Sequence, residues 1–101
     1  MFDSTGADIT NQQQYTFSSA QGEALAVLSL SLNNQGDNSS IVYIDLCDTS
    51  GNRISSLPTF YLDSKESIMV ENKIFVSNGK SLKFTTDSDI NVSVTLSYAM
   101  M

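Results

Sequence analysis

Alternation of apolar and polar residues is the feature that most constrains how this chain can fold. Successive side chains of a β-strand point to opposite faces, so a period of two indicates a strand with one buried face. This period runs through nearly the whole sequence from Tyr15 onward, and its longest run is residues 24–32. Six further strands are expected around residues 42–46, 54, 60–62, 68–70, 82–85 and 92–98. The pattern predicts seven or eight short strands.

Turn-forming residues separate the expected strands. They cluster at residues 33–38, 48–52, 77–80 and 87–89. Within the third cluster, Asn78-Gly79 is a strong hairpin signal, and the single proline, Pro58, favours a strand boundary or an edge strand. No window repeats apolar residues at helical spacing. The sequence therefore predicts an all-β fold, a two-sheet antiparallel β-sandwich or jelly roll.

The first fourteen residues lack this pattern. Residues 1–14 are polar, with Phe2 and Ile9 as the only sizeable apolar side chains. A segment that has no core of its own becomes ordered when a partner holds it. We therefore expect residues 1–14 to be an extended N-terminal arm that docks on partner subunits, and residues 15–101 to be the sandwich domain. The expected partner contacts are Phe2, Ile9 and Tyr15.

Composition bears on partners more than on fold. Charged residues make up only 16% of the chain, and the Ser, Thr, Asn and Gln that replace them suit a surface packed against other subunits. The net charge is −6 and the five Lys and Arg residues form no cluster, so contact with nucleic acid is not expected. The sequence shows no signal-peptide pattern and no apolar run long enough to span a bilayer, so we expect production in the host cytoplasm and no membrane contact.

Histidine is absent from the sequence. Its absence removes Ser-His-Asp and Cys-His nucleophilic catalysis and nearly all zinc sites. The chain is therefore not expected to be an enzyme, and no catalytic residue, metal ligand or cofactor is assigned. Cys47 is the single cysteine, so an intrachain disulfide is excluded, and we interpret it as a small buried strand residue rather than a reactive thiol.

Two pairs of carboxylates stand close together in the sequence, Asp45 with Asp48 and Asp87 with Asp89. Loop carboxylates can bind calcium, and a carboxylate pair can hydrolyse a glycosidic bond. The spacing of a calcium-binding loop is absent, and a chain of this size has little room for a sugar cleft. The favoured interpretation is structural, because Asp side chains initiate turns by accepting backbone hydrogen bonds.

Four tyrosines allow two interpretations. They are Tyr15, Tyr43, Tyr61 and Tyr98. Together they would form a platform on which sugar rings stack. Tyr in strands more often fills the rim of a sandwich with its hydroxyl at the water boundary, and this second interpretation is favoured.

Several motifs from Tyr15 onward occur in a characteristic order. A Tyr-Thr-x-x-x-Ala-x-Gly turn spans residues 15–22. A long strand follows, from Leu28 through Asn34 to Gly36. A strand of alternating Val, Ile and Tyr follows at residues 41–46, and a late block pairs a segment containing Gly-x-Ser-Leu with a final strand that ends in Ser-Tyr. In this order the chain resembles a family of short β-sandwich virion proteins of tailed bacteriophages.

The resemblance implies a structural role in a virion. Proteins of this type are capsid decoration proteins, head fibres, or neck and tail adaptors. We expect a capsid decoration (cement) protein that binds the outer capsid surface, with the major capsid protein or other virion subunits as partners. A homo-oligomer of cyclic symmetry, for example a trimer, is also expected. A neck, tail or fibre adaptor and an adhesion module for host glycans are the alternatives.

Overall fold

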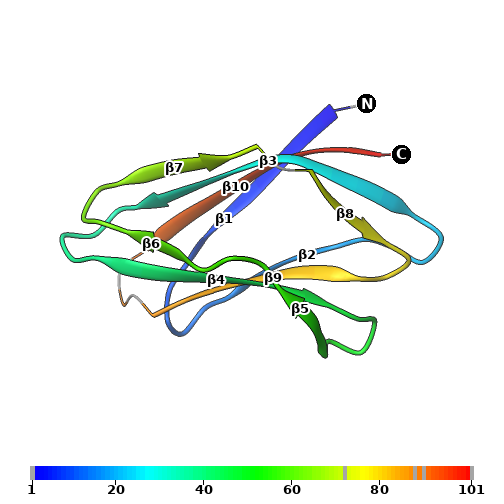
Figure 1. Cartoon of the computed structure of the whole chain (residues 1–101), viewed down its shortest axis with the longest axis horizontal. Coiled ribbons are helices and arrows are strands. Elements are labelled where there is room, and N and C mark those ends of the chain that lie inside the picture. Colours follow the sequence, from blue (N-terminus) through cyan, green and yellow to red (C-terminus); the bar gives the residue numbers. More distant parts are fainter. Residues whose placement is uncertain (1, 72, 88, 90, 101) are drawn as a thin grey trace.

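The computed structural model describes residues 2–71, 73–87, 89 and 91–100, except for the side chain of Phe2. Across these residues the chain forms ten strands in two antiparallel sheets of five strands each (Figure 1). The prediction of an all-β, two-sheet antiparallel sandwich is therefore confirmed. The predicted number of seven or eight strands is too low, because strands at residues 2–9, 15–18 and 74–77 were not among those expected from the sequence.

The two sheets are built from segments that alternate along the chain. The first sheet has the order β1 (Phe2–Ile9), β10 (Val92–Met100), β3 (Ala24–Asn34) and β7 (Ser67–Val70), and β8 (Ile74–Ser77) also pairs with β3. The second sheet has the order β2 (Tyr15–Ser18), β9 (Ser81–Thr86), β4 (Ser40–Cys47) and β5 (Arg53–Ser56), and β6 (Phe60–Leu62) also pairs with β4. Because β1 contacts β2, the edge strands β5 to β8 lie together on the opposite side.

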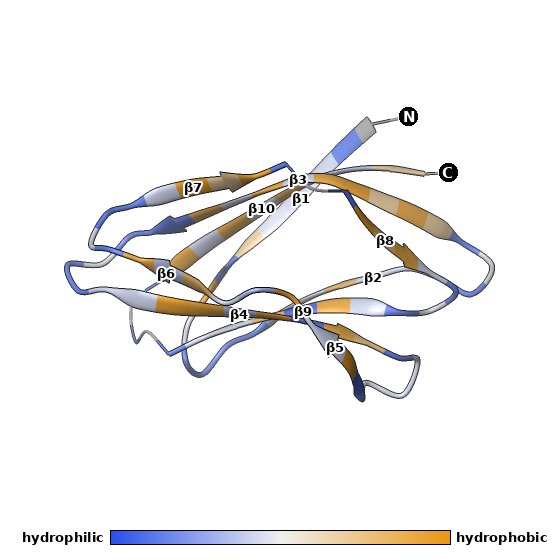
Figure 2. Cartoon of the chain, viewed as in Figure 1, coloured by the Kyte–Doolittle hydropathy of each residue, from blue (hydrophilic) through white to orange (hydrophobic). Residues whose placement is uncertain are grey.

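The core lies between the sheets and follows the period of two. On β10, Val92, Val94 and Leu96 point inward and are buried, whereas Thr95 is exposed. Figure 2 shows the same contrast between the hydrophobic stretches of the strands and the hydrophilic loops that join them. Leu82 and Phe84 of β9 bury the centre of the second sheet in the same way. This alternation is what the sequence pattern predicts for strands with one covered face.

The N-terminal segment corrects one prediction. Over the described residues 2–14 the structure shows no extended arm, since Phe2–Ile9 form β1, which pairs along its whole length with β10. The inward side chains of β1 include Thr5 and Ala7, which are too small to produce a hydrophobic pattern in the sequence. Backbone hydrogen bonds to β10 do not depend on side-chain type, so this strand forms without such a pattern.

The other two strands that were not expected from the sequence are β2 and β8, each of four residues. The predicted Asn78-Gly79 turn is present, and both residues have the positive φ that tight hairpin turns require. This turn nevertheless joins β8 of the first sheet to β9 of the second, so it is not a hairpin between paired strands. Pro58 lies between β5 and β6, at the predicted strand boundary.

Candidate interaction surface

The three predicted partner contacts lie on the side of the sandwich formed by β1 and β2. Ile9, at the end of β1, is 0% exposed and belongs to the hydrophobic core. Tyr15 begins β2 and is half-buried. The backbone of Phe2 pairs with Ala99, and its side chain lies outside the described residues. Their role as partner contacts stays a prediction, and in this structure Ile9 would have to leave the core to fulfil it.

Aromatic contacts close the β1–β2 side. The ring of Tyr15 stacks on Phe84 with 5.9 Å between ring centroids, and that of Tyr98 packs against Phe17 at 5.1 Å. The hydroxyl of Tyr98 donates a hydrogen bond to Oδ2 of Asp3, 3.4 Å away. Burial of the Tyr98 phenol and the negative charge of Asp3 both raise the pKa of Tyr98 above its ordinary value. These tyrosines hold β1 against the rest of the sandwich.

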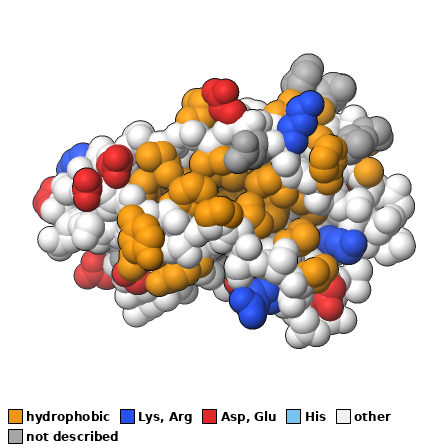
Figure 3. Space-filling model, in the orientation of Figure 1, with side chains coloured by type: hydrophobic (Ala, Val, Ile, Leu, Met, Phe, Trp, Pro, Cys, Tyr) orange, Lys and Arg blue, Asp and Glu red, His pale blue; other side chains and the backbone are white. Residues whose placement is uncertain are grey.

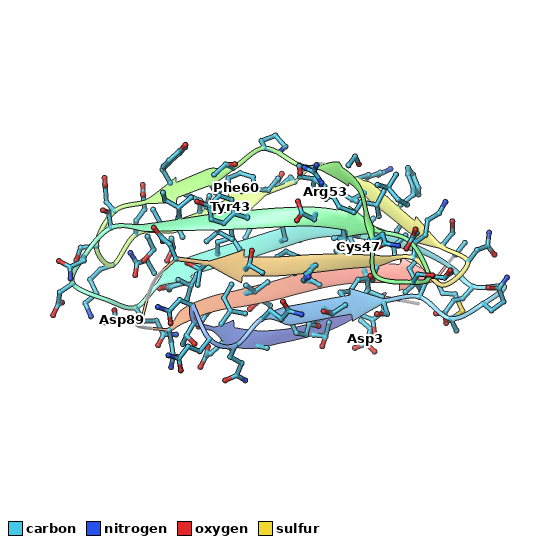
Figure 4. The ribbon with its side chains drawn as sticks, turned by 90° about the horizontal axis from the view of Figure 1, so that it is seen from below. Asp3, Tyr43, Cys47, Arg53, Phe60 and Asp89 are labelled. Carbon is cyan, nitrogen blue, oxygen red and sulfur yellow. The ribbon has the colours of Figure 1, made fainter. Side chains whose placement is uncertain are left out.

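The other two tyrosines lie elsewhere, so the four do not form one platform. Tyr43 on β4 and Tyr61 on β6 are both exposed, on the outer face of the second sheet. Figure 4 shows Tyr43 beside Phe60 at one edge of the molecule and Asp3 at the opposite edge. Any sugar-stacking surface would therefore contain at most Tyr43 and Tyr61.

The carboxylates from the sequence pairs are used by turns and strands. Oδ1 of Asp48 accepts hydrogen bonds from the backbone N–H groups of Ser50 and Asn52, both at 2.9 Å. Oδ1 of Asp87 accepts one from the N–H of Ile41 at 2.8 Å. The predicted role in initiating a turn is thus confirmed for Asp48, whereas Asp87 binds the backbone of a strand far away in the sequence. Among the residues that the structure describes, no group of three or more His, Cys, Asp or Glu side chains could hold a metal ion.

Cys47 is the last residue of β4 and is buried, as the sequence indicated. Its register partner on β5 is Arg53, at a point where the pairing of the two strands is irregular. The placement agrees with a small apolar residue that fills a strand end.

Large exposed apolar side chains gather on the side opposite to β1 and β2. Four of the six such residues in the described chain lie on β5, β6, β7 and β8, one on each strand. They are Ile54 at 51% exposure, Tyr61 at 73%, Met69 at 64% and Phe75 at 57%. Contiguous exposed apolar surface is uncommon on a monomer and usually marks a site of interaction.

Half-buried apolar residues on the same side connect this surface to the hydrophobic core. They pack against the core from one side and are Leu57, Phe60, Ile68, Val70 and Ile74. Figure 3 shows the result as a band of hydrophobic side chains across this face, with charged side chains mainly around it. We call these five residues, together with Ile54, Tyr61, Met69 and Phe75, the apolar edge.

The strands of the apolar edge differ from the central strands in their sequence pattern. Residues 60–62, 68–70 and 74–76 are uninterrupted apolar runs, whereas β9 and β10 alternate apolar residues with Lys, Ser and Thr. Continuous apolar runs are typical of strands that are covered on both faces. In a single chain, β6, β7 and β8 are covered on one face only, because Tyr61, Met69 and Phe75 point away from the core.

Charge is distributed unequally along the sequence. Residues 1–52, which include β1 to β4, contain six Asp and Glu and no Lys or Arg, which accounts for the whole net charge of −6. Residues 53–77, which include β5 to β8, contain three of each sign and are neutral overall. The segment that carries the apolar edge is therefore neutral in sum, although Asp37 and Asp45 of the acidic segment lie beside it, next to Lys65 and Ser56.

A buried amide fixes the loops beside the apolar edge. The side-chain nitrogen of Asn34 donates hydrogen bonds to the carbonyl oxygens of Asn38 at 2.8 Å and Asp63 at 3.1 Å, and its Oδ1 accepts one from the N–H of Gly36 at 2.9 Å. The sequence places Asn34 in a loop cluster and gives no signal that its side chain is buried. By joining the end of β3 to the loop after β6, this amide holds the two sheets together at their β5–β8 side.

Comparison with known proteins assigns no function to the chain. The chain matches no family model, and no curated protein sequence shows significant similarity to it. The described residues also contain no helix that could span a membrane. Within the described residues, the apolar edge stands out as a surface that offers hydrophobic contact area to another molecule.

Proposed function

We propose that this chain is a structural protein of a tailed-bacteriophage virion, a capsid decoration protein that binds the outer capsid surface. The observation that carries the proposal is the apolar edge. A face built from four edge strands, with large apolar side chains left uncovered, fits a subunit that contacts its neighbours in an assembly. The proposed role is not enzymatic, and it requires no cofactor.

The order of the strands supports this class of protein. Treating β5 with β6 and β7 with β8 as single broken strands leaves two sheets of four, in which β1, β10, β3 and β7–β8 face β2, β9, β4 and β5–β6. Successive parts of the chain cross repeatedly between the sheets, as in a jelly roll. Jelly rolls occur in viral capsid proteins and in lectins. We therefore propose a jelly roll as the finer description of the sandwich.

The proposal includes partners and location. The protein is made in the host cytoplasm and is located in the virion, where it contacts the major capsid protein or other virion subunits and further copies of itself. Many weak contacts repeated over a shell give strong overall attachment, so each contact can be modest in area. The scarcity of Lys and Glu relative to Ser and Thr supports such packing, because hydroxyl groups lose less free energy than charges when they leave water.

Quantitative mass spectrometry of purified phage particles tests the proposal. Hundreds of copies of the chain per particle are expected for a capsid decoration protein. A copy number of about a dozen or fewer would instead indicate a neck, tail or fibre adaptor, because those positions are few in a particle. Absence of the chain from particles of the phage that encodes it would overturn the virion role altogether.

A host-glycan-binding adhesion module is the second candidate. It is favoured by the exposure of Tyr43 and Tyr61 on one face of the second sheet and by the use of jelly rolls in lectins. Binding on a glycan array that is lost in Tyr61→Ala, and retained in Tyr15→Phe on the other side of the molecule, would support it. No binding above background would exclude this candidate.

A further inference from the structure

We infer that Asn78 is a site of spontaneous deamidation in this protein, and that the buried hydroxyl of Ser19 slows the reaction there. The site is the turn between β8 and β9, which joins the two sheets. The inference is independent of the proposed role in a virion, because the reaction needs only the folded chain and water.

Deamidation converts the side-chain amide of asparagine into a carboxylate. The backbone nitrogen of the next residue loses its proton to water and attacks Cγ of the asparagine side chain. A succinimide ring forms as the side-chain nitrogen leaves as ammonia. Water then adds to one of the two ring carbonyl carbons and opens the ring. Opening at one carbon gives aspartate, and opening at the other gives isoaspartate, in which the backbone runs through the former side chain.

The sequence makes Asn78 the most reactive asparagine of the chain. A side chain on the following residue hinders the approach of its backbone nitrogen, and glycine has none. Of the eight asparagines only Asn78 is followed by glycine, and its side chain is exposed to water. Asn38 is also exposed and is followed by the small residue Ser39, so it comes next. Asn38 therefore provides an internal reference in the same molecule.

Hydrogen bonds hold the attacking nitrogen in place. The N–H of Gly79 donates a hydrogen bond to Oγ of Ser19 at 3.2 Å, and Ser19 is only 6% exposed. The Ser19 hydroxyl itself donates to the carbonyl oxygen of Lys80 at 3.1 Å, which fixes its orientation. The N–H of Asn78 donates to the carbonyl oxygen of Glu23 at 2.9 Å. Ring closure turns the peptide group between Asn78 and Gly79, so these bonds must break before the reaction can occur.

The packing of the turn restrains it further. Asn78 and Gly79 have φ angles of 53° and 82°. A Cβ atom on Gly79 would lie 2.8 Å from Cγ2 of Thr49, so this turn packs closely on the turn after β4. Figure 1 shows the loops after β2, β4 and β8 at the same end of the sandwich. Deamidation of Asn78 therefore requires local opening of this end, and its rate reports how often the end opens.

The product does not fit the turn as asparagine does. Isoaspartate lengthens the backbone by one carbon and adds a negative charge to a chain whose net charge is −6. A tight turn with positive φ at both central residues has no room for a longer backbone. Isoaspartate at position 78 therefore weakens the junction between the two sheets.

Peptide mapping by mass spectrometry tests the inference on the purified full chain, incubated at neutral pH and physiological temperature. Deamidation is detected because a hydroxyl group replaces an amino group, and it is expected at Asn78. Ser19→Ala removes the acceptor of the Gly79 N–H. It is expected to raise the rate at Asn78 relative to that at Asn38 by about five- to ten-fold, as expected for one hydrogen bond. Ser18→Ala is the matched control, because it removes an exposed hydroxyl next in the chain.

The urea-unfolded chain provides a second measurement that does not require a variant to fold. Its Asn78 is expected to deamidate at least about ten-fold faster than in the folded chain, since all the hydrogen bonds of the turn are lost. Equal rates in the folded and unfolded chains would overturn the protection by the fold. Equal rates in Ser19→Ala and Ser18→Ala, both shown to be folded by circular dichroism, would overturn the role of Ser19. An Asn78 that stays unmodified while Asn38 reacts would overturn the site itself.

Discussion

The two sides of the sandwich solve the problem of exposed sheet edges in opposite ways. On the β1–β2 side, a long edge strand carries small and polar residues, and its one large described apolar side chain, Ile9, is buried. Asp3 and Asp8 add negative charge along β1. The β5–β8 side has four strands of three or four residues, and β6, β7 and β8 carry apolar side chains on both faces.

The apolar residues of the β1–β2 edge are therefore covered within one chain, whereas those of the β5–β8 edge are not. Charged residues along an edge strand discourage pairing with another chain, and small residues leave little apolar surface to cover. Short strands limit the backbone available for pairing, but Met69 and Phe75 leave apolar area in water. The comparison indicates that the N-terminal strand contributes mainly to stability, and it is consistent with the proposal that the apolar edge contributes to assembly.

Deletion of residues 1–9 is expected to have the largest effect among the tests of this comparison. The deletion removes β1 and Ile9, leaves the edge of β10 unpaired and opens the core beneath it. The free energy of unfolding is expected to fall by on the order of 5 kcal/mol, which is as much as the total stability of many domains. Urea unfolding followed by circular dichroism measures the change. Cooperative unfolding at the wild-type urea concentration would mean that these residues are a detachable arm after all.

Substitution of two isoleucines compares the sides directly. Ile9→Ala removes a fully buried side chain and is expected to lower the free energy of unfolding by about 3 kcal/mol. Ile54→Ala changes a side chain that is 51% exposed and is expected to alter it by no more than about 0.5 kcal/mol in the monomer. Chemical denaturation at low protein concentration gives both values. Equal losses at the two positions would remove the distinction between a structural and an assembling side.

Gly6→Ala tests how closely β1 must approach β10. A Cβ atom at this position would overlap the carbonyl oxygen of Val94 and lie 3.1 Å from the Cα of Thr95. Because both neighbours are backbone atoms, β1 would have to shift, and we expect a loss of about 2 kcal/mol in the free energy of unfolding. Ser4→Ala, at an exposed position of the same strand, is the control and should change stability by no more than about 0.5 kcal/mol. Hydrogen exchange of the β1 amides would show the loosening, and unchanged protection would contradict it.

The smallest effect concerns the phenol of Tyr98. Its pKa lies above the ordinary value of about 10, so it stays protonated in the folded chain at pH values where the unfolded chain has begun to lose that proton. The contribution of this phenol to the stability of the fold is therefore fully present below about pH 10, and it is lost as the pH rises through the folded pKa. Absorbance titration at the tyrosinate band, compared with Tyr98→Phe, isolates its ionisation.

Asp3→Asn should lower the pKa of Tyr98, because it removes the negative charge nearest to the phenol. Asp8→Asn removes a charge from the same strand at a position that does not affect Tyr98, so it serves as the control. A titration that is the same in both variants would show that the contact between Asp3 and Tyr98 does not hold in solution.

Several elements of the fold could be predicted because their information is local. The inward face of β10, with Val92, Val94 and Leu96, follows from alternation alone. The turn after β4 follows from Asp48 and Gly51, whose φ of 86° few residues other than glycine adopt. The position of Pro58 between two strands follows from its missing N–H group.

The apolar edge was harder to predict, because its apolar runs can be interpreted in more than one way. The apolar runs at residues 68–70 and 74–76 are visible in the sequence, but a continuous run alone does not distinguish a doubly covered strand from a short buried segment. Ile9 was predicted to contact a partner, and the structure places its side chain in the core, where β10 supplies the backbone partners of β1. Neither outcome depends on residues that are neighbours in the sequence.

By itself the sequence determined the class of the fold, the face on which each alternating strand buries its side chains, and the concentration of negative charge in the first half of the chain. These properties depend on residues within a few positions of one another. The tertiary structure decided that Phe2 pairs with Ala99 from the other end of the chain and that β5 to β8 are edge strands on the same side of the two sheets. Strand pairing is made by backbone groups that are alike in almost every residue, so the partner of a strand is set by the packing of the whole domain.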